Sequence, residues 1–272
     1  MRASRLITMV GLLVLVVACK TNPFTGERNL NFVSNSQIFP ASFQQYDEVL
    51  SQSKVVRNTT EARAIQNVGQ RIATAAKRFL DANGYQGYLQ DYQWEFALLE
   101  DESVNAWAMP GGKIAFYTGI LPIAQDETGI ATIMAHEVAH AVADHGAQRM
   151  SAQQLQQLGA VVGGVALSGS GEQTQQIFAQ AYGLGSQYGV MLPFSRSHET
   201  EADRIGLTLM AIAGYDPAKA PDLWRRMKEA GGEGPPEFLS THPSPDTRIR
   251  NLEQWAPEAK QEAAKYGVTN FR

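Results

Sequence analysis

The sequence predicts an α+β fold that is mostly helical and carries a small mixed sheet. Apolar residues recur at helical spacing in several long segments, and short alternating strand patterns gather between residues 94 and 118. Of the 272 residues, 44% are hydrophobic and 18% are charged, which is enough apolar material for a sizeable core. This composition excludes a disordered chain and the low-complexity classes.

Composition also excludes several functions. The formal net charge is −4 and no basic stripe is present, so we expect no nucleic-acid partner. The single cysteine, Cys19, excludes a disulfide scaffold and a zinc finger built from cysteines. No internal repeat occurs at a period of about 30 to 45 residues, which excludes tandem-repeat binding modules.

The first residues have the pattern of a targeting signal. Arg2 and Arg5 precede an apolar stretch, Leu6–Ala18, that is too short for a membrane span of roughly 20 residues but suits a signal peptide. The small residue Ala18 stands directly before Cys19, so the segment resembles a bacterial lipoprotein signal. The alternative is an uncleaved short anchor with an incidental cysteine.

This resemblance implies cleavage before Cys19, lipidation of that cysteine and attachment of the protein to the periplasmic face of a bacterial membrane. By analogy with enterobacterial sorting, Lys20 in place of an aspartate favours the outer membrane over the inner one. The predicted organisation is a signal peptide at 1–18, a lipid-anchored tether and lead-in segment at 19–45, and one large domain at 46–272.

The first predicted elements of the domain are a helix and three strands. The helix spans Thr59–Leu80, with Thr59 or Thr60 as its cap and apolar residues at helical spacing. The strands are short and surround a Pro-Gly-Gly turn; they are predicted at Trp94–Leu99, Asn105–Met109 and Lys113–Thr118.

A second helix is predicted over Asp126–Asp144, with Asp126 as its N-cap. The segment Ser151–Leu192 is rich in glutamine and glycine. It is either a mobile lid or substrate-facing flap, or two surface helices around a loop. The remaining helices are predicted at His198–Ala213 and Pro217–Ala230, and the residues from Asp246 to Trp255 begin the last helical stretch.

The second helix contains the sequence His136-Glu137-Val138-Ala139-His140. Residues four apart share one helix face, so His136 and His140 can bind one Zn²⁺. Glu137 can then reach a water beside the metal and take its proton without being a ligand. The alternative is two surface histidines with an incidental glutamate.

Two histidines need a third ligand, and the best candidate lies downstream. Glu199 and Asp203 are four apart and share a helix face, whereas Glu201 points to the other side. Glu199 would bind zinc and Asp203 would accept the far N–H of a ligating histidine. The alternative is a solvated acidic turn paired with Arg196 or Arg204.

His145 does not stand where an extended zinc motif would place a third histidine. We therefore expect His145 to be a positively charged residue near the C-terminus of this helix and not a metal ligand.

Further motifs follow the helix in a fixed order: Glu199-x-x-x-Asp203, then Thr241-His242-Pro243, then Arg248. With the His136–His140 motif, they resemble the zinc endopeptidases related to HtpX and the CAAX prenyl protease, especially BepA-like periplasmic lipoproteins without a tetratricopeptide domain. The resemblance implies a zincin-like fold and a zinc metallopeptidase domain at 46–272. It departs from the integral-membrane members of the family, because no spanning helices are predicted here.

The resemblance also implies roles by position. His136, His140 and Glu199 match the zinc ligands, with one zinc per chain, Glu137 the general base and Asp203 the partner of a ligand. A His₂Glu site would also hold other divalent metals.

His242 and Arg248 fall where the family places residues near the reaction centre. His242 either stabilises the oxyanion of the transition state or occupies the open zinc position and holds the enzyme latent. A third alternative is a capping histidine in a proline-rich loop. Arg248 either acts in catalysis or is only a salt-bridge partner.

The segment from Asn105 to Gly112 resembles the stretch before the substrate-binding edge strand of that family. We therefore expect an extended peptide to bind at Asn105 and along an edge strand through main-chain hydrogen bonds. The expected substrate-binding residues of this strand are Lys113, Ile114, Ala115 and Phe116. The alternative is an internal strand of the sheet.

The function predicted from these patterns is a zinc endopeptidase that cleaves unfolded or misassembled cell-envelope proteins. Its expected partners are extended polypeptides, a membrane through the lipid at Cys19, and envelope assembly machinery. Two alternatives remain: a chaperone-like lipoprotein with a latent zinc site, and a zinc hydrolase acting on a non-peptide bond such as a cell-wall amide.

Overall fold

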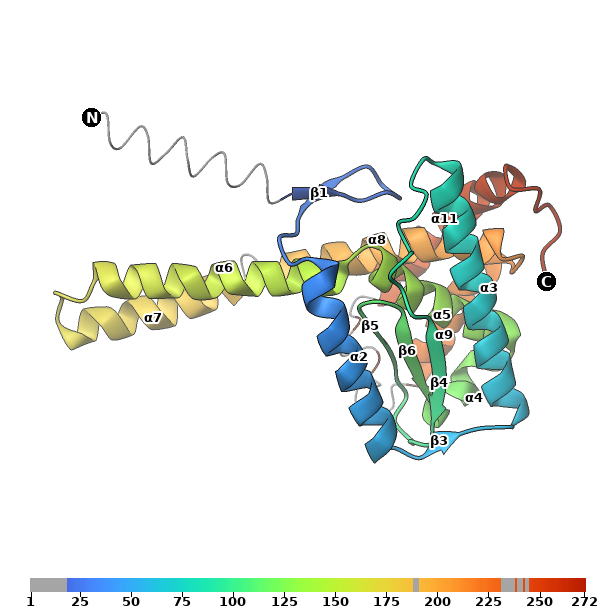
Figure 1. The fold of residues 1–272 in the computed structure, drawn as a ribbon, viewed down its shortest axis with the longest axis horizontal. Helices are drawn as coiled ribbons and strands as arrows, with labels where there is room; N and C mark the ends of the chain where they lie inside the picture. The colour runs from blue at the N-terminus through green and yellow to red at the C-terminus, as the bar shows by residue number, and fades with distance from the viewer. Residues whose placement is uncertain (1–18, 188–190, 231–237, 239–241, 243–244) are drawn as a thin grey trace.

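The computed structural model describes residues 19–187, 191–230, 238, 242 and 245–272. Figure 1 shows the elements, and their bounds in chain order are β1 (Cys19–Thr21), β2 (Arg28–Leu30), α2 (Asn35–Gln52), β3 (Val55–Val56), α3 (Thr60–Ala82), β4 (Glu95–Leu99), β5 (Ala106–Met109), β6 (Lys113–Tyr117), α4 (Leu121–Ala124), α5 (Glu127–Val142), α6 (His145–Ala166), α7 (Glu172–Ser186), α8 (Leu192–Ile212), α9 (Ala220–Glu229) and α11 (Pro245–Ala264). The predicted fold class, mostly helical with a small mixed sheet, is confirmed.

The sheet has the strand order β3-β4-β6-β5. Strands β4 and β6 are parallel, and the other two pairings are antiparallel. The prediction of an edge strand at Lys113–Phe116 is therefore wrong, because β6 lies between β4 and β5. Ile114, Ala115 and Phe116 are all fully buried, which is the continuous apolar run of a strand covered on both faces. The open edge next to the metal-motif helix is β5.

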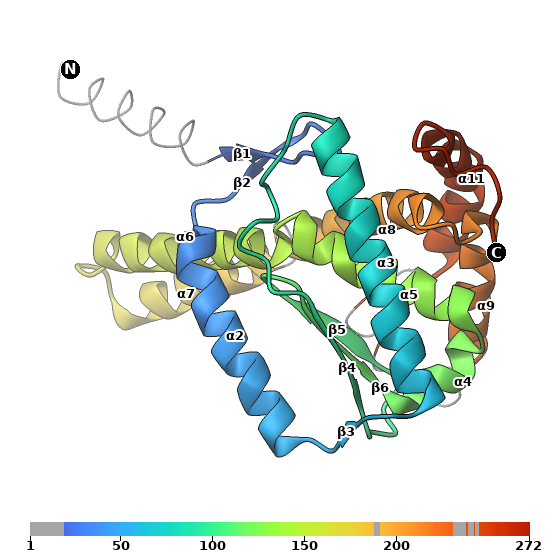
Figure 2. The ribbon, with the colours of Figure 1, turned by 45° about the vertical axis from the view of Figure 1, so that its right-hand side comes forward.

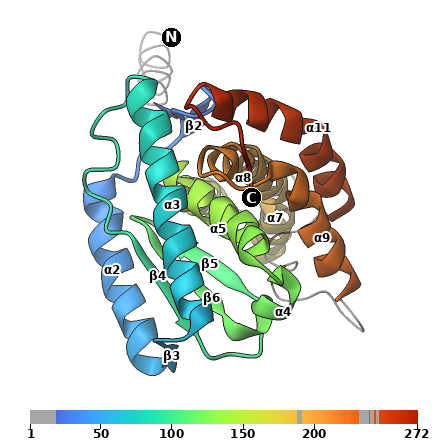
Figure 3. The same ribbon diagram turned by 90° about the vertical axis from the view of Figure 1, so that its right-hand side faces the viewer.

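Alternate residues of the strands face two different helical layers. Phe96 and Leu98 of β4 pack into the main core with α3 and α5. Ala97 and Leu99 pack on the other side with Tyr46 of α2. Figure 2 shows α2 and α3 on opposite sides of the strands, and Figure 3 shows α5 enclosed between α3, α8 and α9. The helix that carries the metal motif is therefore the central element of the core.

Side chains cap the two predicted helices as expected. The Thr59 hydroxyl accepts a hydrogen bond from the backbone N–H of Ala62, and the Asp126 carboxylate accepts one from that of Gly129. Gly206 of α8 lies against α5 so closely that a Cβ at this position would be 3.0 Å from backbone atoms of Ala135 and His136. The absent side chain lets the two site-bearing helices approach each other.

The segment at 19–45 is packed against the domain and is not a loose tether. Strands β1 and β2 pair from Cys19↔Leu30 to Thr21↔Arg28, and Phe24 stacks on Phe79 of α3 at 4.8 Å. The predicted boundary at 45/46 falls inside α2 and does not separate two units. The packing of this segment could not be predicted, because its composition is mostly polar and only a few of its residues, such as Phe39, are buried.

Within the predicted segment 151–192, residues 151–187 are described up to the gap at 188–190 and form most of a helical hairpin, α6–α7, which extends away from the body in Figures 1 and 2. The alternative of two surface helices around a loop is thus confirmed. Phe178 and Tyr182 of α7 pack where Gly163 and Gly159 of α6 leave space. The outward apolar side chains remain exposed, among them Val161 at 62%.

The predicted signal peptide at 1–18, and Thr241 and Pro243 of the third motif, lie outside the described residues. Cys19 begins β1 and is half-buried. Within the described part of the chain, none of the helices combines the length and the apolar character that a membrane crossing needs.

Candidate metal centre

The two histidines of the motif converge inside the protein. Four residues apart on α5, His136 and His140 turn their Nε2 atoms toward one point, and these atoms are 3.1 Å apart. Glu199 approaches the same point from α8: its Oε2 is 3.3 Å from His136 Nε2 and its Oε1 is 3.3 Å from His140 Nε2. The structure thus brings together the three predicted metal ligands from two helices.

His242 supplies a fourth donor. Its Nδ1 atom lies 3.1 Å from His136 Nε2 and 2.6 Å from Glu199 Oε2. Donor atoms of His136, His140, Glu199 and His242 all lie within 4.8 Å of one another. The stacked ring of Phe238, 4.4 Å from the His242 ring, supports it from behind.

This donor set fits a zinc ion. Zn–N bonds of about 2.0–2.1 Å in a tetrahedron give donor–donor edges of about 3.3 Å, close to the observed separations. Glu199 Oε1 is buried and, beyond the 3.3 Å approach of His140 Nε2, has no hydrogen-bond partner within the described residues. The Nε2 atoms of His136 and His140 face each other at 3.1 Å beside Glu199 Oε1. A cation between these three atoms satisfies all of them best.

A buried charge network holds the ligands from the far side. The Nδ1 atom of His136 is 2.9 Å from Asp203 Oδ1. The guanidinium of Arg248 bonds Asp203 through Nε and Glu199 Oε2 through Nη2, the latter at 2.8 Å, and lies 3.9 Å above the Trp224 ring. Asp203 therefore has its predicted place, and Arg248 acts on the ligands rather than facing the groove.

The electrostatics of the site favour a positive charge between the ligands. Burial lowers the pKa of His136, but hydrogen bonds to Asp203 and Glu199 outweigh it and raise this pKa to about 9. Burial acts to raise the pKa of Glu199, yet hydrogen bonds from His136, His140 and His242 hold it well below its ordinary value. A bound cation would supply the same positive charge that a proton supplies at His136.

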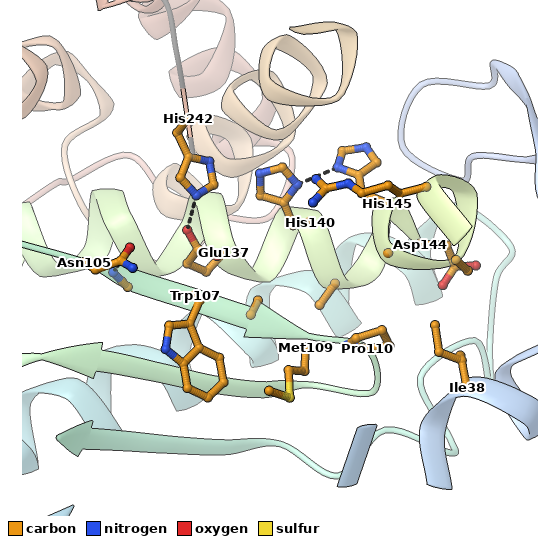
Figure 4. Close-up of a pocket in the computed structure, with 16 residues that line it drawn as sticks. Ile38, Asn105, Trp107, Met109, Pro110, Glu137, His140, Asp144, His145 and His242 are labelled. Atoms are coloured by element: carbon orange, nitrogen blue, oxygen red, sulfur yellow. Dashed lines mark hydrogen bonds and ion pairs between the residues drawn. The ribbon is translucent and has the colours of Figure 1, made fainter. Parts of the chain in front are cut away.

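Glu137 lies on the side of the metal-ligand cluster that borders a surface groove. Its side chain is buried, and burial raises the pKa of its carboxyl group. Its Oε1 lies 3.7 Å from Nε2 of His242 and has no hydrogen-bond partner among the described residues. Figure 4 shows His242 directly over Glu137. A raised pKa and a free lone pair suit a group that must take up a proton and release it.

A groove of about 230 Å³ runs from Glu137 along β5. Figure 4 shows Trp107, Met109 and Pro110 along this groove and Ile38 at its far end. The side-chain oxygen of Asn105 accepts a hydrogen bond from the Ala106 N–H at 2.9 Å, so this predicted substrate-binding residue shapes the start of β5.

Strand β5 turns free main-chain groups toward the groove. Tyr117 N–H bonds Asn105 C=O, which fixes the register with β6, so Ala106 and Ala108 direct their main-chain groups to the open side. The Ala106 N–H is already taken by the Asn105 side chain, which leaves the Ala106 C=O and both groups of Ala108 for a partner strand. Phe238 N–H already bonds the Val104 C=O on that side. By contrast, Lys113 pairs with Glu95 at 2.9 Å and lies over the rings of Phe43 and Tyr46, away from the groove.

His145 is not a cation at a helix end. It begins α6, is 1% exposed, and burial lowers the pKa of its ring, so it is neutral. Its Nδ1 is 2.8 Å from His140 Nδ1 and its Nε2 is 2.9 Å from Glu201 Oε2. As expected, Glu201 is not in the donor cluster. The contact between His140 and His145 was missed because the break between α5 and α6 disrupts the helical spacing.

The comparisons with known proteins agree with this geometry. The model of peptidase family M48 matches residues 59–256. The chain belongs to peptidase family M48. The mitochondrial metalloendopeptidase OMA1 of Schizosaccharomyces pombe is 38% identical over 191 residues, covering 70% of this chain and 53% of that protein. OMA1 of Saccharomyces cerevisiae is 34% identical over 206 residues, covering 72% and 56%.

A bacterial relative, the beta-barrel assembly-enhancing protease of Yersinia pestis, is 30% identical over 173 residues, covering 61% of this chain and 35% of that protein. The chain spans about half the length of the two fungal OMA1 relatives and about a third of this one. The family-level resemblance is thus confirmed as M48, whereas the closer BepA-like assignment is not, since OMA1 proteins match as well.

In this member of family M48, donor atoms of His136, His140, Glu199 and His242 form a group of the kind that holds a metal ion, and Glu137 lies beside it. Zinc held by His136, His140 and Glu199 would polarise a peptide carbonyl and acidify a water molecule. The carboxylate of Glu137 lies beside the ligands, where it would take a proton from a water molecule and return it to a leaving amine. Asp203 and Arg248 keep His136 and Glu199 in position.

Proposed function

We propose that this protein is a zinc-dependent endopeptidase that cleaves unfolded or misassembled proteins of a bacterial cell envelope. The observation that carries the proposal is the metal-type donor cluster, with Glu137 beside it, at the end of a groove along the open edge of β5. A groove of this kind accepts an extended chain and reads its backbone more than its side chains.

Substrate would add to β5 as a further strand. The outward C=O of Ala106 and the outward N–H and C=O of Ala108 would hydrogen-bond the peptide and bring a carbonyl next to Glu137. A folded protein cannot offer such a free strand, so selection falls on unfolded or misassembled segments. The name of the bacterial relatives, which refers to β-barrel assembly, supports an envelope role and contact with assembly machinery.

The proposed location is the periplasmic face of the membrane, with the outer membrane favoured by Lys20. Support comes from the lipoprotein-like signal before Cys19. The Cys19→Ser variant should leave the membrane fraction and enter the soluble fraction; continued retention in membranes would contradict a lipid anchor.

The position of His242 favours a second state, in which the zinc site is latent. Zinc sites with three protein ligands are catalytic, and those with four are closed. With Nδ1 of His242 among the donors, no position is left for water and substrate. The chaperone-like alternative corresponds to a protein that stays in this state.

The test is cleavage of casein by residues 19–272 carrying Cys19→Ser, compared with the same chain carrying Glu137→Gln or His242→Ala. An endopeptidase loses activity with Glu137→Gln and on chelation of zinc. Faster cleavage by His242→Ala identifies a latent enzyme, and slower cleavage indicates oxyanion support instead. No cleavage by any variant, with zinc bound one to one, would favour the chaperone-like alternative.

A further inference from the structure

The two histidine ligands are supported differently on their far sides. His136 meets the carboxylate of Asp203 directly. His140 meets a second imidazole, that of His145, at 2.8 Å between the two Nδ1 atoms. His145 in turn meets Glu201 at 2.9 Å. The dashed line in Figure 4 marks the contact between the rings of His140 and His145.

Only one arrangement of protons satisfies this chain when His140 Nε2 binds a metal. His140 then carries its proton on Nδ1 and donates it to the lone pair of His145 Nδ1. His145 must therefore carry its own proton on Nε2, and it donates that proton to Glu201 Oε2. Each contact has one donor and one acceptor, so the ring of His140 is fixed in its orientation and its tautomer.

Glu201 is itself held by the N-terminal segment. Its Oε1 accepts hydrogen bonds from Asn22 Nδ2 at 2.7 Å and from the Thr25 hydroxyl at 2.9 Å. Asn22 is only 5% exposed, and its side-chain oxygen accepts the Phe24 N–H at 2.8 Å. The side chain is thus locked, with its amide group directed at Glu201.

The N-terminal segment is fixed by contacts independent of Glu201. Phe24 stacks on Phe79, and Lys20 pairs with Asp144 at 3.7 Å. Phe32 N–H donates to the hydroxyl of Ser151 in α6 at 3.2 Å. The β1–β2 hairpin is therefore a packed support on which Asn22 and Thr25 are placed.

We propose that His145 and Glu201 are positioning residues for the zinc ligand His140, and that Asn22 and Thr25 of the β1–β2 hairpin complete this support. The inference rests on zinc binding at the site of the proposed function. It extends the metal site to a segment that lies 179 residues before Glu201 in the chain. Outer partners of this kind contribute about 10- to 100-fold to metal affinity.

The test measures the zinc dissociation constant of the 19–272 chain with Cys19→Ser by competition with a chelator. Thr25→Val removes the hydroxyl at constant shape, and Thr25→Ser is its matched control. Asn22→Asp keeps the contact with Phe24 but sets a carboxylate against Glu201. Glu201→Gln removes the negative charge and replaces one of the two acceptor oxygens with an NH₂ donor, and Glu258→Gln, at an exposed pair with Arg204, is the control for loss of a carboxylate.

We expect zinc affinity to fall about 10-fold or more with Glu201→Gln and Asn22→Asp, and by less with Thr25→Val, with both controls unchanged. The melting temperature of each metal-free variant is measured alongside, because a purely structural role would lower it without a separate loss of zinc affinity. The imidazole ¹⁵N spectrum of the zinc-bound protein should also show a protonated Nδ1 at His140.

Zinc affinity within about twofold of the parent in Glu201→Gln would overturn the proposal. Loss of affinity with Glu201→Gln, but not with Asn22→Asp or Thr25→Val, would overturn the part assigned to the N-terminal hairpin. A parent chain that binds no zinc would overturn the proposed function as well, so the two failures are distinguishable.

Discussion

At the scale of single residues, the site depends on which atoms are left without partners and which are not. Glu137 Oε1 and Glu199 Oε1 are buried without a hydrogen bond of good geometry among the described residues, and the same holds for His136 Nδ1, although it lies 2.9 Å from Asp203 Oδ1. On the far side of His140, by contrast, the ring meets His145 Nδ1 at 2.8 Å. In the proposed mechanism Glu137 is the base and Glu199 a metal ligand, whereas Arg248 positions Glu199 and Asp203.

Glu137→Gln should retain zinc and lose turnover by about 10²- to 10⁴-fold, since an amide has the shape of the carboxylate but cannot accept the proton of water. Zinc content by atomic absorption and cleavage of a fluorogenic peptide check this together. Residual activity close to that of the parent would show that another group acts as the base.

Arg248→Met should destabilise the metal-free protein by roughly 3–5 kcal/mol, because it leaves the buried carboxylates of Asp203 and Glu199 without their cation. Added zinc should restore part of this loss, since it again places positive charge beside Glu199. Urea unfolding with and without zinc measures both effects. Equal destabilisation in the two conditions would separate Arg248 from the metal site.

At the scale of elements, the close contact between α5 and α8 holds the ligands at the right separation. Ligands from α5 and α8 meet across a contact that Gly206 makes possible. The hairpin α6–α7 contributes to the site only through its first turns, where His145, Gln148 and Ser151 are buried.

Gly206→Ala should lower the free energy of unfolding by about 1–3 kcal/mol and weaken zinc binding, since the new methyl group forces α8 away from the backbone of α5. Gly164→Ala is the matched control, because a Cβ there meets nothing within 4 Å. The control should be neutral or slightly stabilising. Chemical denaturation and zinc titration of both variants check the difference.

At the scale of the whole molecule, the proposed membrane anchor and the metal site share one short segment. Asn22, which holds Glu201, is three residues after Cys19. The hairpin α6–α7 projects separately and exposes a run of apolar side chains along α6. Between Met150 and Ser195 only Glu172 is charged, so the hairpin α6–α7 has few charged side chains to favour its solvation.

Replacing residues 155–186 with a short Gly-Ser linker should leave the zinc dissociation constant within about twofold of the parent. The buried first turns of α6 remain, and the outer hairpin packs on itself through Phe178 and Tyr182. Zinc titration and circular dichroism measure the result. A large loss of zinc affinity would show that the hairpin supports the site from a distance.

The sequence alone determined what depends on local spacing. The separation of His136 and His140, that of Glu199 and Asp203, and the cap at Asp126 follow from the geometry of a single helix. The helices α3, α5 and α9 and all three strands of the 94–118 region were predicted within a few residues for the same reason, whereas α2 was not predicted and α8 begins before its predicted start at His198.

Only the tertiary structure decided what depends on non-local packing. The order of strands placed β6 inside the sheet and left β5 as the open edge, although both have similar local patterns. The break between α5 and α6 brought His145 to His140, and the packed β1–β2 hairpin brought Asn22 to Glu201. Such contacts join residues far apart in the chain, so no spacing rule contains them; they arise when whole elements bury their apolar faces together.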